Sequence, residues 1–296
     1  MGERVVKANG IDVWTEDFGS PADPAILLVM GATAQGILWP EEFCMALVAA
    51  GRYVIRFDNR DTGKSTCFDF ATAPYALGDM ARDAVGVLDA YGIARAHVVG
   101  ASMGGMIAQT IAIEHPERML SMTSIMSSPI GGELAAAGGT GAGLPGPEPR
   151  VLEAVALLAT TPATNDTDRV ELAVKLWRAL AGSADPVDEA AVRERERRVL
   201  ARARNIDAAQ NHSLAIGRSP DRREGLRKVR VPTLVIHGTD DPILPLPHGK
   251  ATADCVQASK LITIAGMGHD LPPRVGETVL NAIVEHTGGR RPATVA

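Results

Sequence analysis

The chain has 296 residues, of which 46% are hydrophobic and 22% are charged, and its formal net charge is −5. This length is compatible with one large α/β domain or with two small ones, and it allows a substantial core without disulfide or metal support. The acidic balance argues against nucleic acid and anionic membrane as the main partner, because both demand a concentrated basic surface.

Cys44, Cys67 and Cys255 are widely spaced and include no CxxC pair, which predicts free thiols in a reducing compartment. The first residues contain no apolar segment of the kind found in signal peptides. No apolar run approaches the ~20 residues that a membrane-spanning helix requires. We therefore expect a cytoplasmic protein.

Short apolar runs bounded by turn residues alternate with helical patterns along most of the chain. Asn9-Gly10 tolerates positive φ and predicts a hairpin between strands at 4–8 and 11–15. Ala25–Met30 is apolar throughout, as expected of a strand covered on both faces. This alternation predicts an α/β fold with a mostly parallel central sheet flanked by helices. Further strands are expected at Tyr53–Phe57, His97–Gly100, Met119–Met126, Thr233–His237 and Lys260–Ile264, and helices at Leu77–Tyr91, Met103–Glu114 and Val275–His286.

The alternation breaks between about residues 130 and 230. Residues 131–149 are rich in glycine, alanine and proline and predict a flexible loop. We expect an α/β core formed by residues 1–130 and 231–296, with a helical cap inserted at 131–230. Helices of the cap are predicted at Arg150–Ala159, Thr167–Ala181 and Asp188–Ile206.

The sharpest signal is Gly100-Ala-Ser-Met-Gly104, a G-x-S-x-G pattern between an apolar strand and a helix. A serine on such a tight turn is held in strained backbone geometry that exposes its Oγ, and small flanking residues let neighbouring backbone approach. The following helix directs free N–H groups toward developing negative charge. We predict that Ser102 is a catalytic nucleophile; the alternative is a glycine-rich turn with an incidental serine.

The partners of a serine on this turn follow in the order acid, then histidine. His269 lies in Gly266-Met-Gly-His269, after the last expected strand, where the glycines let the loop reach the carboxyl edge of the sheet. His97, His115 and His286 lie in or at the end of a strand or helix, so we expect them to be structural or solvated. His269 is therefore the predicted base.

The acid is expected after the penultimate strand, in Thr239-Asp-Asp241-Pro242. Pro242 holds Asp241 in an extended conformation, and the G-x-x-D-P spacing favours Asp241, with Asp240 as a turn or cap residue. A lone loop aspartate more often forms a turn. In order with Ser102 and His269, Asp241 is predicted to fix the histidine tautomer and stabilise its imidazolium.

Stabilisation of a tetrahedral intermediate requires preorganised donors, usually two backbone N–H groups. We predict Met103, directly after the nucleophile, and Ala32, after the first buried strand, with Thr33 as the less favoured neighbour of Ala32. A plain strand-exit loop is the alternative for Ala32. Neither cofactor nor metal is expected, because no ligand cluster has zinc-type spacing. A substrate pocket is predicted from Thr33, Trp39, Met106, Met126, Trp177 and His212, although buried Met and Trp are more often core.

Two polar segments have structural interpretations. Residues 58–65 lack the G-x-x-x-x-G-K spacing of a phosphate loop and predict a hydrogen-bonded turn. The arginine-rich run 193–204 predicts a solvated helix face with ion pairs such as Glu194–Arg198.

In this order the motifs resemble the α/β-hydrolase superfamily over nearly the whole chain, and within it the aclacinomycin (anthracycline) methylesterases of polyketide biosynthesis. The shared stretches are Trp14–Gly19 with Pro21–Pro24, Leu28–Gly31, Arg60–Gly63, His97–Gly100, Leu144–Pro147, Asp241-Pro242 with Pro247–Gly249, and Gly266–His269.

The resemblance implies an α/β-hydrolase fold and hydrolysis of a carboxylic methyl ester on a large aromatic polyketide. It also implies triad and oxyanion roles at Ser102, Asp241, His269, Met103 and Ala32. Ala32 stands where that family has glycine, which keeps the backbone donor but narrows the pocket beside it. The elbow looks closer to general lipases and esterases of the superfamily.

The residues thus predict hydrolysis of a small-molecule carboxylic ester, with no nucleic-acid or membrane partner and no indication of oligomeric state. The same triad on this fold also serves cofactor-free haloperoxidases (perhydrolases) and C–C bond hydrolases. A decarboxylase or other lyase would use the same pocket with Ser102 dispensable. A non-catalytic ligand-binding protein is a further alternative, which a broken triad would favour.

Overall fold

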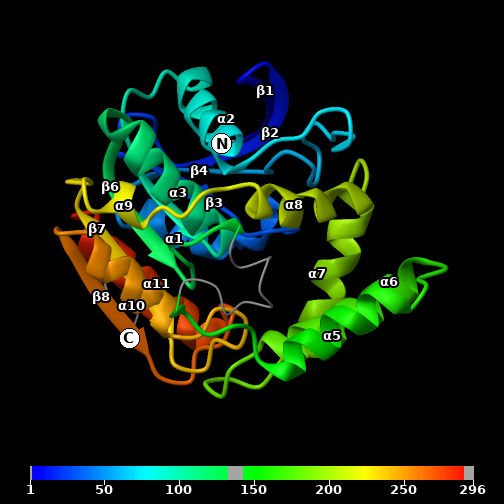
Figure 1. The fold of residues 1–296 in the computed structure, drawn as a ribbon. Coiled ribbons are helices and arrows are strands. Elements are labelled where there is room, and N and C mark those ends of the chain that lie inside the picture. The colour runs from blue at the N-terminus through cyan, green and yellow to red at the C-terminus, as the bar shows by residue number, and fades with distance from the viewer. Residues whose placement is uncertain (1, 133–142, 290–296) are drawn as a thin grey trace.

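The structure is a computed structural model that describes residues 2–132 and 143–289, and its centre is one eight-stranded sheet (Figure 1). The strands lie in the order β1-β2-β4-β3-β5-β6-β7-β8. The first two pairings are antiparallel and the remaining ones are parallel, which confirms the predicted mostly parallel sheet. The strands are β1 (Gly2–Ala8), β2 (Ile11–Phe18), β3 (Ala25–Val29), β4 (Tyr53–Phe57), β5 (Ala96–Ala101), β6 (Met119–Ile125), β7 (Thr233–Gly238) and β8 (Ser259–Ile264).

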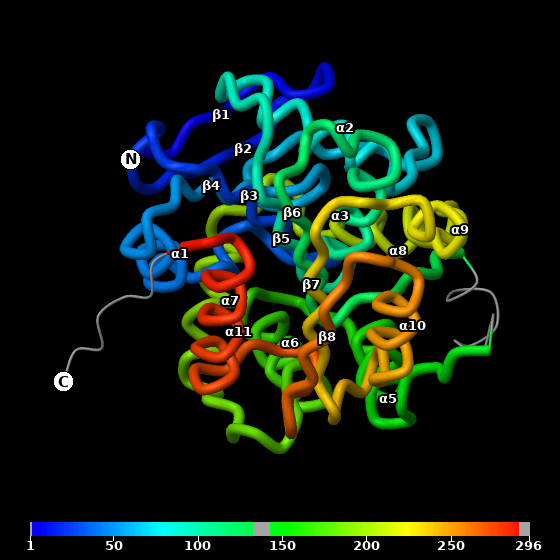
Figure 2. Tube along the Cα trace, turned by 90° about the vertical axis from the view of Figure 1, so that its left-hand side faces the viewer, coloured from blue at the N-terminus to red at the C-terminus, as the bar shows by residue number. Residues whose placement is uncertain are grey.

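Helices cover both faces of the sheet (Figure 2). Along β3, Leu27 and Val29 belong to one hydrophobic cluster while Ile26 and Leu28 belong to the other. This division arises because successive side chains of a strand point to opposite faces. One face is covered by α1 (Glu41–Ala49) and α11 (Pro273–His286), and the other by α2 (Leu77–Ala90), α3 (Met103–Glu114) and α10 (Pro247–Cys255).

Some boundaries differ from the sequence-based prediction. The prediction ends β2 at Thr15, but the strand continues to Phe18 because residues 15–18 pair with β4. The helices α1, α10 and α8 (Asn211–Gly217) are not predicted. None of them exceeds nine residues, which is too short for a clear helical period. Short helical segments also occur at η1 (Gly36–Leu38), η2 (Pro116–Arg118), η4 (Asp207–Gln210) and α9 (Arg223–Leu226).

Between β6 and β7 the described chain contributes helices and no strand to the sheet. Part of the predicted loop 131–149, residues 133–142, lies outside the described residues. Asn165 and Asp188 cap two of the helices, because their side-chain oxygens accept backbone N–H groups of the first turn. The three long helices are α5 (Pro149–Thr160), α6 (Asp166–Leu180) and α7 (Glu189–Arg202), and they stand to one side of the sheet in Figure 1.

Buried polar contacts tie the end of α7 to the loops after β3 and β4. The guanidinium of Arg202 pairs with the fully buried Asp58 (Nη2–Oδ2 3.0 Å) and donates to the side chain of Gln35 (2.5 Å). Asp58 also accepts the backbone N–H groups of Gly36 (2.7 Å) and Lys64 (2.9 Å). The predicted hydrogen-bonded turn at 58–65 is therefore confirmed. The helix ends at Arg202, four residues before its predicted end.

The ion pairs of α7 differ from the predicted example. Arg193 pairs with Glu189 one turn earlier (3.1 Å) and with Glu171 of α6 (2.7 Å), whereas no Glu194–Arg198 pair occurs within the described residues. Arg195 also departs from the predicted solvated face, because its guanidinium lies 4.1 Å from the ring centroid of Trp177. The helix thus uses its arginines to pack against α6.

A buried ion pair gives a test of the core. Asp83 of α2 accepts two hydrogen bonds from Arg60 (2.6 and 2.7 Å), and both side chains are almost fully buried. Asp83→Ala leaves the guanidinium buried without its partner, so we expect a loss of about 3–5 kcal/mol in the free energy of unfolding, measured by urea denaturation. Asp89→Ala on the same helix removes an exposed partner of Arg118 and should cost less than about 1 kcal/mol. Equal losses in the two variants would contradict this account.

Candidate active site

Ser102 occupies a strained turn between β5 and α3, with φ 55° and ψ −121°. A methyl group on Gly100 would lie 2.0 Å from the carbonyl oxygen of Gly104, and one on Gly104 would lie 2.1 Å from that of Val29. Only glycine fits at these two positions, which lets α3 begin directly against the sheet. The turn is therefore the one that the G-x-S-x-G pattern predicts.

The structure brings Ser102, His269 and Asp241 together at the carboxyl edge of the sheet. The Oγ of Ser102 lies 2.9 Å from Nε2 of His269. The other ring nitrogen, Nδ1, lies 2.9 and 3.0 Å from the two carboxylate oxygens of Asp241. A neutral His269 in this line donates from Nδ1 to the carboxylate and accepts the serine hydroxyl proton at Nε2. This geometry suits removal of the hydroxyl proton as the oxygen attacks.

Asp241 is fully buried and held by several donors. Its Oδ1 accepts the backbone N–H groups of Ile243 (3.1 Å) and Leu244 (2.9 Å). Burial alone would raise the pKa of Asp241, but the charge of His269 and hydrogen bonds from His237 and His269 outweigh it and lower the pKa. The carboxyl is thus an anion around neutral pH, as a partner of an imidazolium must be.

The loop after β3 lies against the serine. A methyl group on Gly31 would lie 3.1 Å from Cβ of Ser102 and 3.6 Å from its Oγ, so the backbone that follows β3 runs beside the Ser102 hydroxyl. Thr33 has φ 61°, and its N–H donates to Nδ1 of His212 (3.0 Å). Within the described residues, the N–H groups of Ala32 and Met103 donate no hydrogen bond. Of the two neighbours considered, Ala32 therefore keeps its amide available.

The predicted pocket residues differ in their surroundings. Trp39 and His212 have no exposed surface, and His212 uses both ring nitrogens internally because Nε2 donates to the carbonyl oxygen of Arg60 (2.7 Å). Both are packing residues in this structure. Met106 and Met126 are buried with only a few per cent of their surface exposed. Trp177 is half-buried, and its indole N–H donates to Glu196 (3.0 Å), while Thr33 is exposed.

Two residues near the triad, His237 and Asp270, are not among the predicted site residues. His237 is fully buried, with Nε2 3.4 Å from Oδ2 of Asp241 and 2.6 Å from the carbonyl oxygen of Leu244. Asp270 follows His269 directly, and its Oδ1 is buried without a hydrogen-bond partner in the described part of the chain. The sequence carries a weak signal for both, because each stands next to or within a motif already singled out.

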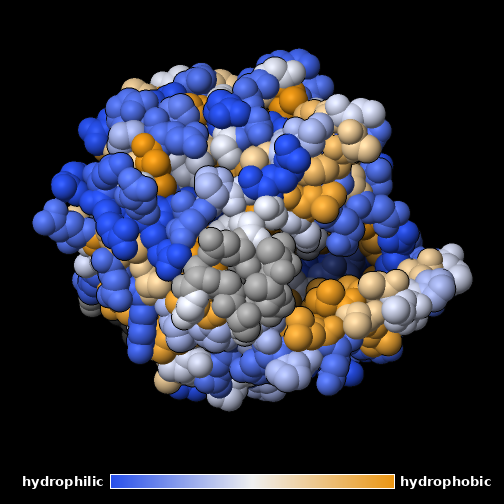
Figure 3. All heavy atoms as spheres, viewed as in Figure 1, coloured by the Kyte–Doolittle hydropathy of each residue, from blue (hydrophilic) through white to orange (hydrophobic). Residues whose placement is uncertain are grey.

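The molecular surface is hollowed beside the helices that separate β6 from β7 (Figure 3). Apolar side chains gather over α5 at the edge of this hollow, and polar surface lies at its depth. The exposed large apolar residues of α5 are Leu152, Val155 and Leu157.

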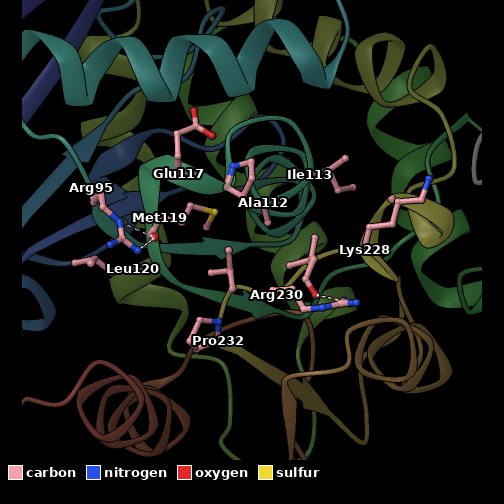
Figure 4. A pocket seen from close by; sticks show the side chains of 13 residues that line it. Arg95, Ala112, Ile113, Glu117, Met119, Leu120, Lys228, Arg230 and Pro232 are labelled. Atoms are coloured by element: carbon pink, nitrogen blue, oxygen red, sulfur yellow. Dashed lines mark hydrogen bonds between the residues drawn. The ribbon is translucent and has the colours of Figure 1, made fainter.

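A different pocket, of about 580 Å³, lies at the amino ends of β5, β6 and β7 (Figure 4). It is lined by residues such as Arg95, Met119 and Pro232, which precede or begin those strands. The triad follows the carboxyl ends of its strands, and ligands of open α/β sheets bind at that edge. The pocket in Figure 4 therefore lies at the wrong end of the sheet to serve the triad.

Among residues 2–132 and 143–289 no group of three or more His, Cys, Asp or Glu side chains is arranged to hold a metal ion. In the same ranges no helix has the length and apolar character needed to cross a bilayer.

Residues 24–272 match the model of the alpha/beta hydrolase fold family. Over the whole length of both chains, the protein is 37% identical to the rhodomycin D methylesterase DauP of Streptomyces sp. (strain C5) and 36% identical to the rhodomycin D methylesterase DnrP of Streptomyces peucetius. Among solved structures, the enol-lactonase of Burkholderia xenovorans LB400 superposes with a TM-score of 0.76 at 20% identity, covering 96% of this chain and 100% of the other. That likeness concerns the fold alone.

The Asp270 carboxyl gives a pH-dependent test. Burial raises its pKa to about 6, although the charge of His269 acts to lower it. The folded protein therefore binds this proton more tightly than the unfolded chain. The contribution of the protonated carboxyl to the stability of the folded state is complete below pH ~4 and is lost as pH rises through about 6. Asp270→Asn should be more stable than the wild type at pH 7.5, by on the order of 1–2 kcal/mol, with the difference vanishing near pH 4.

Urea denaturation at both pH values measures this difference. Asp254→Asn, at an exposed position, serves as the matched control. A gain for Asp270→Asn that is equal at the two pH values would contradict the argument.

Proposed function

The chain belongs to the alpha/beta hydrolase fold family, and from this membership we propose a serine-dependent carboxylic ester hydrolase that acts on a small-molecule methyl ester of an aromatic polyketide. The observation that carries the proposal is the line of short contacts from Ser102 through His269 to Asp241. The similarity to two rhodomycin D methylesterases over the whole chain supports the type of ester.

The proposed reaction proceeds through an acyl-enzyme. The Oγ of Ser102 attacks the ester carbonyl carbon while Nε2 of His269 takes the hydroxyl proton. The imidazolium passes that proton to the departing alkoxide, and methanol leaves when the substrate is a methyl ester. Water, deprotonated by His269, then attacks the acyl-enzyme, which releases the carboxylic acid and restores Ser102. Asp241 holds the histidine ring in the required tautomer and stabilises its positive charge throughout.

The oxyanion of each tetrahedral intermediate is proposed to bind the backbone N–H groups of Met103 and Ala32. Both amides are free of other partners among the described residues, and both belong to segments that touch Ser102. The engagement of the Thr33 amide by His212 supports Ala32 over its neighbour. Donors fixed by the backbone need no reorganisation when charge develops, which is the source of their catalytic value.

The helices between β6 and β7, within residues 131–230, are proposed to act as a cap over the substrate. The hollow beside them and the apolar side chains of α5 at its edge offer a surface for a flat aromatic ring system (Figure 3). Such a surface binds by removing apolar area from water, and a few polar groups then fix the orientation of the ligand.

The alternative activities are not favoured. Peracid formation, C–C bond hydrolysis and decarboxylation use related sites, but the relatives matched over the full chain are methylesterases. A ligand-binding protein without turnover has no need of a histidine that lies within 3.0 Å of a serine hydroxyl on one side and of a carboxylate on the other.

Hydrolysis of p-nitrophenyl esters and aromatic methyl esters tests the proposal, with Ser102→Ala compared against the wild type. We expect kcat to fall about 10³-fold or more, because removal of a triad member typically costs this much. Ser259→Ala, at the start of β8, serves as a serine-to-alanine control and should keep wild-type kcat. Equal activity of the wild type and Ser102→Ala would overturn the proposal.

A further inference from the structure

The last residue of α6 and the first part of its connection to α7, residues 180–184, pack directly on the loop that carries His269. The N–H of His269 donates to the carbonyl oxygen of Leu180 (2.8 Å), and the N–H of Ala184 donates to that of Gly266 (2.9 Å). Leu180 is the last residue of α6, where helix carbonyls lack partners within the helix. The backbone of the histidine thus completes the end of a helix that belongs to the inserted segment.

Residues 180–184 and the loop of His269 approach so closely that no side chain fits between them. A methyl group on Gly182 would lie 2.1 Å from the carbonyl oxygen of Gly266 and 2.3 Å from the backbone nitrogen of Gly268. In the other direction, a methyl group on Gly268 would lie 2.2 Å from the nitrogen of Gly182. Backbone opposes backbone at each of these contacts, so neither side can yield without moving the loop.

The same connection also contacts the loop that carries Asp241. The hydroxyl of Ser183 donates to Oδ2 of Asp240 (2.5 Å), and the backbone N–H of Ser183 lies 3.3 Å from the same oxygen. Asp240 precedes the triad acid directly. The connection therefore bridges the loops of the base and of the acid, and through a hydrogen bond from Arg150 to the carbonyl of Ala181 (3.0 Å) it also contacts α5.

We propose that residues 180–184 form a positioning element for the catalytic histidine, with Gly182 and Ser183 as its positioning residues. The inference rests on the proposed function, because it assumes that His269 acts as the base for Ser102. The element sets the place of the His269 backbone relative to Ser102 and to Asp241. Catalysis in this chain thereby depends on the inserted helices as well as on the α/β core.

The physical consequence is a separation of turnover from binding. Displacement of the His269 loop by about 1 Å lengthens the contact between Nε2 and Oγ, and misplacements of this size cost up to ~10²-fold in rate. The exposed apolar side chains of α5, which we propose to bind substrate, do not belong to this loop. Variants of the element should therefore lower kcat much more than they change KM.

Gly182→Ala is the first variant, because its new methyl group meets backbone on the His269 loop. Labelling of Ser102 by a fluorophosphonate is measured beside p-nitrophenyl acetate hydrolysis. The probe reacts with an activated serine, which displaces fluoride from phosphorus. We expect the second-order labelling rate and kcat to fall about 10- to 100-fold, with KM changed less than about twofold. Gly276→Ala is the matched control, since its methyl group would meet nothing nearer than 3.9 Å.

Ser183→Ala is the second variant and keeps the test decisive if Gly182→Ala fails to fold. Ser183 is exposed, so loss of its hydroxyl removes the shorter of its two hydrogen bonds to Asp240 without opening a cavity, and the backbone N–H contact remains. We expect the labelling rate to fall about three- to tenfold, and Ser183→Thr, which keeps a hydroxyl, to recover most of it. If Ser183 had only a structural role, Ser183→Ala would lower the thermal midpoint of unfolding, and Ser183→Thr would not restore the labelling rate.

The outcomes separate the two proposals. A wild-type protein that resists the fluorophosphonate overturns the serine hydrolase function itself. Wild-type labelling together with unchanged labelling rates in folded Gly182→Ala and in Ser183→Ala overturns the positioning role and leaves the function standing. Slower labelling in these variants, with Gly276→Ala at the wild-type rate, supports it.

Discussion

The close approach of α3 to the sheet is the constraint on which the site depends. Gly100 and Gly104 let the first turn of the helix touch the backbone of β3 and β5, and Ser102 between them takes a backbone conformation that L-residues avoid. Such a conformation costs about 1–3 kcal/mol. The burial of α3 offsets that cost, because apolar side chains such as Ile107 and Ile111 are almost fully buried and each contributes about 1.5–3 kcal/mol.

The second constraint is electrostatic. Asp241 is fully buried, and a carboxylate in that position is stable only because backbone N–H groups and two histidines surround it. His237 belongs to β7, so the sheet itself supplies part of this environment. The loop of His269 meets the carboxylate from the next connection along the sheet. At this edge of the sheet, the contacts that hold the fold together therefore also hold the Asp241 carboxylate in place.

Local patterns in the sequence were sufficient to predict Ser102, Asp241 and His269, the three residues that the structure brings together. Ser102 lies in a turn that only a few residue types can form. Asp241 and His269 follow β7 and β8, whose β-branched and apolar residues, such as Val235 and Ile262, predict strands. Contacts between distant segments were not predictable in this way. The engagement of His212 with Thr33 joins residues 179 positions apart and leaves no local pattern.

The helical boundaries show the same limit. α2, α3 and α6 have long apolar patterns and were predicted within one or two residues. The end of α7 was not, because it is set by Arg202 reaching the buried Asp58 in a loop far away in the sequence. The sequence around Trp39 likewise did not indicate that its side chain is fully buried, so it was predicted as a pocket residue. Tertiary contacts, and not propensity, decided both.

The helices α6 and α7 are held to the rest of the described structure at two separate places, and these contacts restrict how the helices can move. The C-terminus of α7 is tied through Arg202 and Asp58 to the loops after β3 and β4. The C-terminus of α6 is tied to the loop of His269. A rigid outward rotation of all three helices would break one of these attachments.

Helix α5 is differently placed. It carries the exposed apolar side chains and contacts the α6–α7 connection through Arg150. If the proposed cap binds substrate, we expect adjustment to ligands of different size to concentrate on α5. The buried ion pair at Arg202 and the backbone contacts of Gly182 oppose movement of α6 and α7.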